Sequence, residues 1–186
     1  MRFLVAVLAC AIATGTAFSA ETDKTTKQAE VRKSTQAALE RFYKENPALR
    51  GEVKRAPGYA VFTTYGLSFL FGGAGGSGLA HNNKSGHSTY MNMAQASVGV
   101  QIGAAQSETL IIFKSPKALS QFVDKGWEFG GGGAIDAGAG GKTIAVPGGG
   151  GENVIADALY YTLTKNGIQA GGAVAGTKFW KSDDLN

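Results

Sequence analysis

The stretch Ala94–Phe113, AQASVGVQIGAAQSETLIIF, carries the strongest fold signal in the chain. Its first half alternates between small or polar residues and an apolar face formed by Val98, Val100, Ile102 and Ala104. This period of two predicts a β-strand that ends at the polar pair Gln106–Ser107. Residues 109–113 are apolar on both faces and predict a second, central strand covered on two sides. Glycines at alternate strand positions cost stability, so we expect another backbone, a side chain or a ligand close to that face.

Two helices are predicted before these strands. Asp23 is a suitable N-cap for a helix that runs to about Glu45. The apolar stripe of this helix consists of Val31, Thr35, Ala38 and Phe42. The sequence Asn46–Pro47 ends it and can start a shorter helix, in which Leu49 and Val53 face inward.

The chain beyond Pro57 contains 26 of the 28 glycines and predicts strands. We expect a strand at residues 59–65, a second apolar segment at 67–71, a bend or close-packed crossing at 72–78, and a hairpin formed by 79–81 and 88–93 around the turn 82–86. Further strands are expected within 127–146, 154–164 and 168–180, the last two forming a hairpin, with a loop at 147–151.

One helix is predicted between the strands. Ser115 is a suitable N-cap, Pro116 fits the first helical position, and Gly126 ends the helix. Its inward-facing residues are Leu119, Phe122 and Val123. Together these elements predict an α+β fold, in which N-terminal helices pack on a curled antiparallel β-sheet, barrel- or sandwich-like, with one inserted helix.

The N-terminus has the features of a secretory signal peptide. Arg2 is followed by an apolar run and by the small-x-small site Ala17–Ser19, which predicts cleavage after Ser19 and an exported protein, periplasmic or associated with the outer membrane. The apolar run is too short for the alternative, a transmembrane anchor. Cys10 loosely resembles a lipoprotein site but lies very early, so lipidation is the lesser alternative. We therefore divide the chain into a signal peptide (1–19), an N-terminal helical segment (20–57) and a glycine-rich β-rich part of the same domain (58–186).

The positive charge of the chain is concentrated near its start. The net charge is +4, and residues 21–55 hold nine Lys or Arg against six Asp or Glu. Residues 56–186 hold eight of each and no arginine. A basic segment suggests an anionic partner surface, and in an exported protein a membrane or an envelope polymer fits better than nucleic acid. The alternative is an ordinary solvated helix face.

We find no pattern that supports catalysis, a cofactor or a metal. The glycine run 73–78 matches G-x-G-x-x-G, but a hairpin rather than a helix follows it. Residues 136–143 resemble a phosphate-binding loop but also lack the helix. His81 and His87 flank one hairpin turn without a third ligand, which makes a poor metal site. Asp157 interrupts an apolar face, and we expect it to be buried and paired.

Several of these segments together resemble the SYLF lipid-binding domain, in its bacterial exported branch. The resemblance covers about residues 24–180 and rests on KRAPGYAVF (54–62), the glycine run 72–78, ASVGVQIGA (96–104), LIIF (110–113), the helix at 117–122, GWE (126–128) and the ending 167–179. It implies a helix-plus-curled-sheet fold and non-enzymatic lipid binding. Relatives include yeast actin-patch proteins, but Ser88–Met91 replaces a tryptophan-containing eukaryotic segment and the tyrosine-rich tail is missing. Actin binding is therefore not expected.

The main hypothesis is a lipid- or membrane-binding protein of the bacterial envelope that binds anionic phospholipid and has no enzymatic activity. The candidate lipid-binding residues are Lys24, Lys27, Arg32, Lys33, Arg41, Lys44, Lys54 and Arg55. The apolar side chains of Val31, Phe42 and Tyr43 either insert into the membrane or pack on the sheet. The alternatives are a small outer-membrane β-barrel, a structural protein with an envelope protein or polymer as its partner, and an enzyme acting on envelope lipid.

Overall fold

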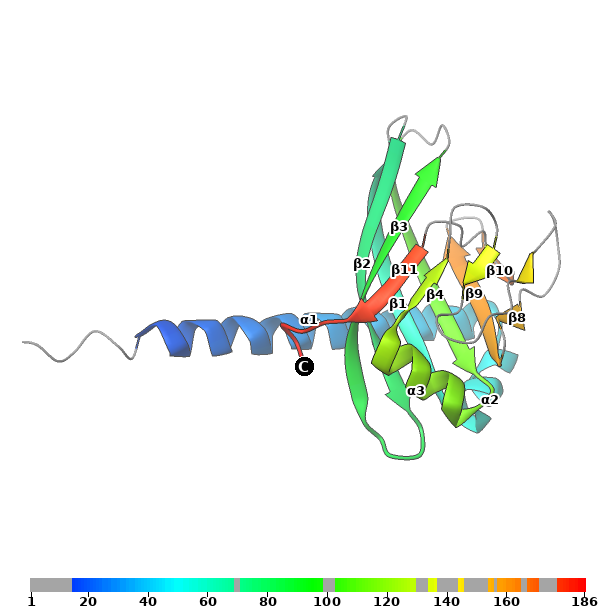
Figure 1. Cartoon of the computed structure of the whole chain (residues 1–186), viewed down its shortest axis with the longest axis horizontal. Coiled ribbons are helices and arrows are strands. Elements are labelled where there is room, and N and C mark those ends of the chain that lie inside the picture. The colour runs from blue at the N-terminus through cyan, green and yellow to red at the C-terminus, as the bar shows by residue number, and fades with distance from the viewer. Residues whose placement is uncertain are drawn as a thin grey trace, which may run out of the picture.

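The computed structural model describes residues 15–68, 71–98, 103–129, 134–136, 144–145, 154–155, 157–164, 167–170 and 177–186. These residues form three helices and one antiparallel sheet (Figure 1). The helices are α1 (Gly15–Glu45), α2 (Ala48–Arg55) and α3 (Pro116–Lys125). The strands are β1 (Gly58–Ser68), β2 (Phe71–Asn82), β3 (Ser88–Val98), β4 (Gly103–Phe113), β5 (Trp127–Phe129), β6 (Ala134–Asp136), β7 (Ile144–Ala145), β8 (Val154–Ile155), β9 (Ala158–Thr164), β10 (Gly167–Ala170) and β11 (Thr177–Lys181).

The sheet has the strand order β10-β9-β4-β1-β2-β3-β11-β5-β6-β7, with β8 paired to β9. Strand β1 therefore lies near the centre, between β2 and β4. Helix α1 crosses one face of the sheet, and α3 packs on the other (Figure 1). The predicted fold class, N-terminal helices on a curled antiparallel sheet with one inserted helix, is confirmed.

The hydrophobic core is divided between the two faces of the sheet. The α3-side cluster includes Phe62, Ile111, Phe113, Phe122 and Phe179, and the Phe122 ring packs against the other three phenylalanine rings. The α1-side cluster includes Ala38, Phe42, Leu49, Val53, Val61, Leu110 and Ile112. Residues 110–113 alternate between the two clusters and are all buried, which confirms the prediction of a strand covered on both sides. Each large buried side chain contributes roughly 2 kcal/mol.

The strand predicted from residue 94 onward is wrong in its boundaries. Strand β3 ends at Val98 and β4 begins at Gly103, so the alternating stretch belongs to two strands, and residues 99–102 lie outside the described part. The polar pair Gln106–Ser107 does not break a strand, because it lies inside β4. Thr64 on β1 provides hydrogen-bond partners for Ser107. The Thr64 Oγ1 hydroxyl lies 2.6 Å from Ser107 Oγ and 2.9 Å from the Ser107 carbonyl oxygen.

The glycine run at residues 72–78 is a strand, not a bend. It pairs with β1 on one side and with β3 on the other. The expected close approach does exist within this strand. A Cβ atom added at Gly78 would lie less than 3.0 Å from the Val61 carbonyl oxygen and from the Phe62 ring. The absence of a side chain at this position thus lets Phe62 lie against the β2 backbone.

Two helix predictions are confirmed and one helix start is wrong. Helix α2 contains the buried residues Leu49 and Val53, and α3 is capped by Ser115, whose Oγ accepts a hydrogen bond of 3.1 Å from the Ala118 amide. Helix α1 begins at Gly15 rather than after Asp23, because no proline interrupts the backbone hydrogen bonds between these residues. The predicted signal peptide thus overlaps α1 at residues 15–19, while Cys10 lies outside the described residues.

Two predictions about the C-terminal strands also need correction. The stretch 168–180 is not one strand: β10 pairs with β9, whereas β11 lies between β3 and β5. Asp157 is exposed rather than buried, with a positive φ of 64° at the turn before β9. Its carboxylate accepts a hydrogen bond of 3.2 Å from Ser115 Oγ, so it connects this turn to the start of α3.

Candidate functional site

The apolar stripe of α1 faces the sheet. Val31, Thr35, Ala38 and Phe42 are at most 7% exposed, which confirms the predicted stripe. Tyr43 is half-buried against the α1-side cluster. The pKa of Tyr43 is raised to about 12, mainly by burial and further by the neighbouring Tyr59. The positive charge of Arg50 acts in the opposite direction. Val31, Phe42 and Tyr43 therefore serve the core in this structure, and the candidate site is left with the cations of the segment.

Arg41 holds a buried carboxylate in the sheet. Its guanidinium donates two hydrogen bonds to the Glu108 side chain, Nε to Oε2 at 3.0 Å and Nη2 to Oε1. The Arg41 side chain is half-exposed, whereas that of Glu108 is 5% exposed. A buried carboxylate without a counter-charge is strongly unfavourable. Arg41 is therefore engaged in joining α1 to β4, and its charge is already balanced.

Two further predicted site residues also make contacts within the molecule. Lys24 Nζ donates to the main-chain oxygen of Asn186 at 3.0 Å. Arg32 Nε donates to the Tyr90 hydroxyl at 2.6 Å, and its guanidinium carbon lies 5.2 Å from the centre of that ring. These contacts fix the first half of α1 to β3 and to the C-terminal residues, so both side chains have a structural role.

Five predicted site residues remain exposed, and no hydrogen bond or ion pair engages their side chains within the described part of the chain. They are Lys27, Lys33, Lys44, Lys54 and Arg55. Along α1 these cations alternate with acids, since residues 21–45 hold six Lys or Arg and five Asp or Glu. The last turn of α2, in contrast, has two adjacent cations, Lys54 and Arg55. The basic segment is thus more strongly positive at its C-terminal end.

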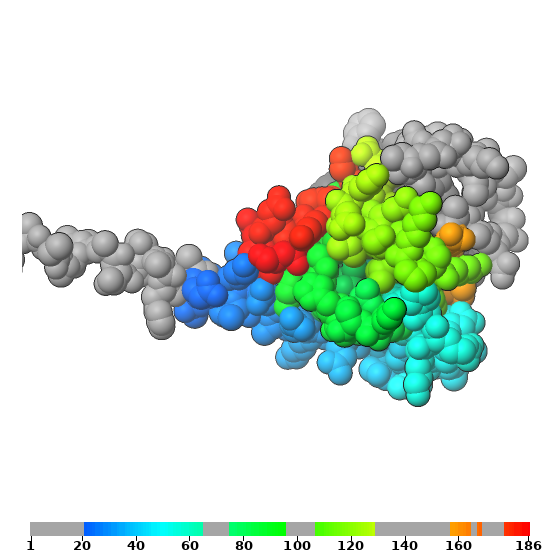
Figure 2. Space-filling model, turned by 60° about the horizontal axis from the view of Figure 1, so that its bottom comes forward, coloured from blue at the N-terminus to red at the C-terminus, as the bar shows by residue number. Residues whose placement is uncertain are grey.

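The fold brings three lysines from other parts of the chain to the same end of the molecule. Lys84 is in the β2–β3 hairpin, Lys114 follows β4, and Lys117 is in the first turn of α3. Figure 2 shows α2 (cyan), this hairpin (green) and α3 (yellow-green) gathered on one face. We call Lys54, Arg55, Lys84, Lys114 and Lys117 the basic end; all five side chains are exposed.

Backbone pairing explains why these cations meet. Gly58, three residues after Arg55, is paired with Asn82 on β2 and with Phe113 on β4. The Asn83 amide nitrogen Nδ2 donates to the carbonyl oxygens of Val53 and Ala56, at 2.6 and 2.9 Å, and so holds the hairpin turn against the end of α2. Sequence analysis missed Lys84, Lys114 and Lys117 because they are isolated lysines in a stretch of zero net charge. The signal that could have identified them is that each adjoins a strand end or turn.

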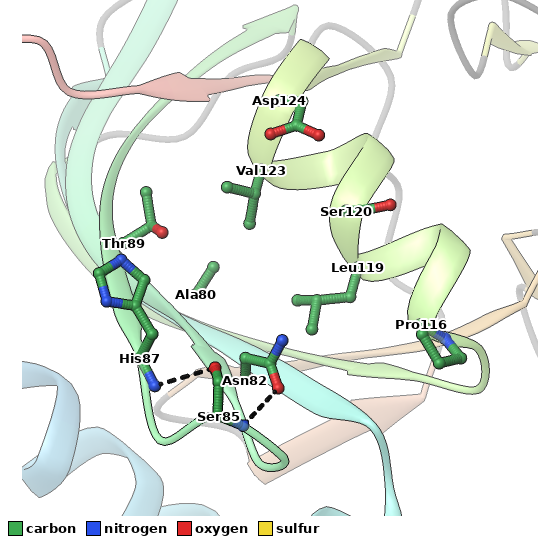
Figure 3. Close-up of a pocket in the computed structure, with 10 residues that line it drawn as sticks. All are labelled: Ala80, Asn82, Ser85, His87, Thr89, Pro116, Leu119, Ser120, Val123 and Asp124. Atoms are coloured by element: carbon green, nitrogen blue, oxygen red, sulfur yellow. Dashed lines mark hydrogen bonds between the residues drawn. The ribbon is translucent and has the colours of Figure 1, made fainter.

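A shallow hollow of about 180 Å³ lies between the β2–β3 hairpin and α3 (Figure 3). Ala80, Leu119 and Val123 contribute apolar side chains to it. Part of its polar rim is used by the hairpin turn, because Asn82 Oδ1 accepts from the Ser85 amide at 3.1 Å and Ser85 Oγ accepts from the His87 amide at 3.3 Å. The hollow thus adjoins the basic end without adding a cation of its own.

The two histidines do not form a shared ligand pair. The Nδ1 atom of His81 lies 2.8 Å from Ser88 Oγ, and its ring packs on Tyr59. Burial lowers the pKa of His81, and the neighbouring His87 lowers it further, so His81 is neutral at pH 7. Among the residues that the structure describes, no group of three His, Cys, Asp or Glu side chains is arranged to hold a metal ion. No helix in the same part of the chain is long and apolar enough to span a bilayer.

The fold and the candidate site define an α+β binding protein with a cationic surface. A family model described as Ysc84, Las17-binding protein actin regulator, matches residues 94–186. The chain is also 30% identical over 164 residues to beta cell expansion factor A of Aeromonas veronii, which covers 87% of this chain. The chain belongs to the Ysc84 family, the family of the SYLF domain, as the resemblance predicted.

The description of the family model is that of a binding protein and regulator, which agrees with the coarse prediction of a binding protein. The chain spans about 60% of the length of the Aeromonas relative that it matches.

Proposed function

We propose that this protein is an exported, non-enzymatic binding protein of the bacterial envelope that associates with anionic phospholipid surfaces. The observation that carries the proposal is the set of exposed cations in the N-terminal helices for which the described residues offer no hydrogen-bond or ion-pair partner, namely Lys27, Lys33, Lys44, Lys54 and Arg55. Each lysine or arginine close to an anionic leaflet contributes on the order of 1 kcal/mol. Membership of a family of binding proteins supports the same reading.

Binding on this proposal is electrostatic. The stripe Val31, Thr35, Ala38 and Phe42 is buried against the sheet and does not insert. The proposed association therefore depends on charge, which salt screens over about 10 Å at 0.1 M ionic strength. Arg41 contributes little, because Glu108 already neutralises it.

Co-sedimentation of the purified protein with vesicles tests the proposal. We expect pelleting with vesicles that contain phosphatidylglycerol, weaker pelleting at high salt, and none with pure phosphatidylcholine vesicles. The variant Lys27→Gln, Lys33→Gln, Lys44→Gln should bind at least fivefold more weakly, since one lysine near the surface is worth about that factor.

The matched control removes three exposed lysines that lie outside the N-terminal helices and outside the basic end. In Lys125→Gln, Lys178→Gln, Lys181→Gln the net charge changes by the same amount, but these residues lie in α3 and β11. Binding of this control should stay within about threefold of the unmodified protein, because these lysines are not among the cations that the proposal places at the membrane surface. Absence of pelleting by the unmodified protein on anionic vesicles at low salt would rule out the proposed function.

A further inference from the structure

The basic end has a larger excess of cations over acids than the rest of the cationic surface. Its five cations come from α2, the β2–β3 hairpin, the residue after β4 and the start of α3. Three acids lie nearby: Asp157, through its hydrogen bond to Ser115, Glu52 in α2, and Asp124, which lines the adjoining hollow. Along residues 21–45 of α1, by comparison, five acids accompany six cations. The local excess of positive charge is therefore larger at the basic end than along α1.

The rigidity of this end favours a defined contact surface. Gly58 on β1 is paired on one side with β2 and on the other with β4. The Asn83 side chain fixes the hairpin turn to the end of α2. Ser115 Oγ caps α3 and donates to the Asp157 carboxylate, and the Lys114 amide donates to the Asp157 carbonyl oxygen at 2.6 Å. The backbones that hold Lys84, Lys114 and Lys117 are thus fixed before any ligand is present, which lowers the entropy cost of binding.

The partial charges at the ends of the two helices in this region are compatible with an anionic ligand. Helix α3 directs its N-terminus, with its partial positive charge, to the same end as Lys114 and Lys117. The C-terminal carbonyls of α2 would oppose an anion, but the Asn83 amide satisfies those of Val53 and Ala56.

We infer that the protein docks with the basic end against the anionic headgroups of a bilayer. This inference rests on the proposed function and names the surface that performs it. The charge complementarity between five exposed cations and a negatively charged leaflet identifies the partner as a membrane surface. Lys84, Lys114 and Lys117, which lie outside the N-terminal helical segment, then become the principal headgroup contacts.

The test compares three triple variants on the same phosphatidylglycerol vesicles at low salt. The variant Lys84→Gln, Lys114→Gln, Lys117→Gln should lose affinity on the order of a hundredfold, since about fivefold per lysine multiplies over three residues. The variant Lys27→Gln, Lys33→Gln, Lys44→Gln should lose less than this. The control Lys125→Gln, Lys178→Gln, Lys181→Gln should stay within about threefold of the unmodified protein.

The outcomes separate this inference from the proposed function. If the unmodified protein binds anionic vesicles in a salt-sensitive way and the Lys84, Lys114, Lys117 variant binds as the control does, docking through the basic end is wrong although the protein is a lipid binder. If the α1 variant loses more than the basic-end variant, the contact lies along α1 instead. The nine lysines are exposed, so all variants should show the circular dichroism spectrum and melting temperature of the unmodified protein within a few degrees.

Discussion

Glycine has two different roles along β2, and single substitutions can separate them. A Cβ atom at Gly78 would lie less than 3.0 Å from the Val61 carbonyl oxygen and the Phe62 ring, whereas a Cβ atom at Gly75 would meet no atom within 4 Å. We expect Gly78→Ala to lower the free energy of unfolding by more than about 2 kcal/mol, because Phe62 is fully buried and has no room to move.

The matched substitution Gly75→Ala should leave stability unchanged or raise it by about 0.5 kcal/mol, since alanine restricts the unfolded chain. Urea unfolding followed by fluorescence measures both variants. Equal destabilisation by the two substitutions would show that glycine is needed for backbone conformation along the whole strand rather than for close packing at residue 78.

At the scale of the elements, α1 is joined to the sheet by an ion pair as well as by apolar packing. Arg41→Met would leave the buried Glu108 carboxylate without its counter-charge, and we expect the free energy of unfolding to fall by about 3 kcal/mol. The double variant Arg41→Met, Glu108→Met removes both charges and should recover most of that loss, because apolar replacement of a buried pair is often nearly neutral. Chemical denaturation of the single and double variants distinguishes these cases.

The same pair clarifies what Arg41 contributes to function. A destabilisation below about 1 kcal/mol in Arg41→Met would mean that the pair is effectively solvated and that the Arg41 charge is available to a ligand. A large loss that the second substitution reverses would support the structural role described above.

At the scale of the whole molecule, the C-terminal residues hold the first half of α1 in place. The Asn186 amide donates to the main-chain oxygens of Tyr90 and Ser182 and accepts from the Tyr90 amide, at distances of 2.8, 2.5 and 3.0 Å. Gln28 Nε2 on α1 donates to the Leu185 oxygen at 2.8 Å, and Leu185 packs against Val31 and Tyr90. The beginning and the end of the domain are therefore in contact.

We expect Asn186→Ala to weaken this contact by about 2 kcal/mol, since each lost hydrogen bond contributes about 1 kcal/mol and part of the loss is recovered by solvent. Amide hydrogen exchange should become faster at residues 24–34 of α1 but not at residues 38–45, which pack on the α1-side cluster. The exposed neighbour Asp184→Ala is the control and should leave exchange unchanged. Uniformly faster exchange along α1 would contradict a local role for Asn186.

Local sequence patterns predicted the helices and the fold class well. The stripe Val31, Thr35, Ala38 and Phe42, the cap at Ser115 and the turn after Asn82 are set by neighbours within a few residues, so periodicity and capping rules apply to them directly. The family resemblance rests on the order of such segments and was confirmed.

Strand boundaries were predicted less well, because they depend on partners distant in the sequence. Gln106–Ser107 reads as a polar break until Thr64 is placed beside it, and the glycine run 72–78 reads as a bend until its pairing with β1 and β3 is known. The stretch 168–180 likewise forms two strands, because β10 pairs with β9 whereas β11 pairs with β3.

Residue patterns alone were enough to predict the class of the protein: two amphipathic helices, a glycine-rich antiparallel sheet, an inserted helix and a cationic N-terminal segment. Which cations are engaged and which remain exposed became known from the three-dimensional structure. Arg41 is neutralised by Glu108, 67 positions along the chain, and Lys84 is brought beside α2 by the pairing of β1 with β2. The physical reason is that helix and strand periodicity are properties of neighbouring residues, whereas a charged surface is assembled from residues that only the paired sheet brings together.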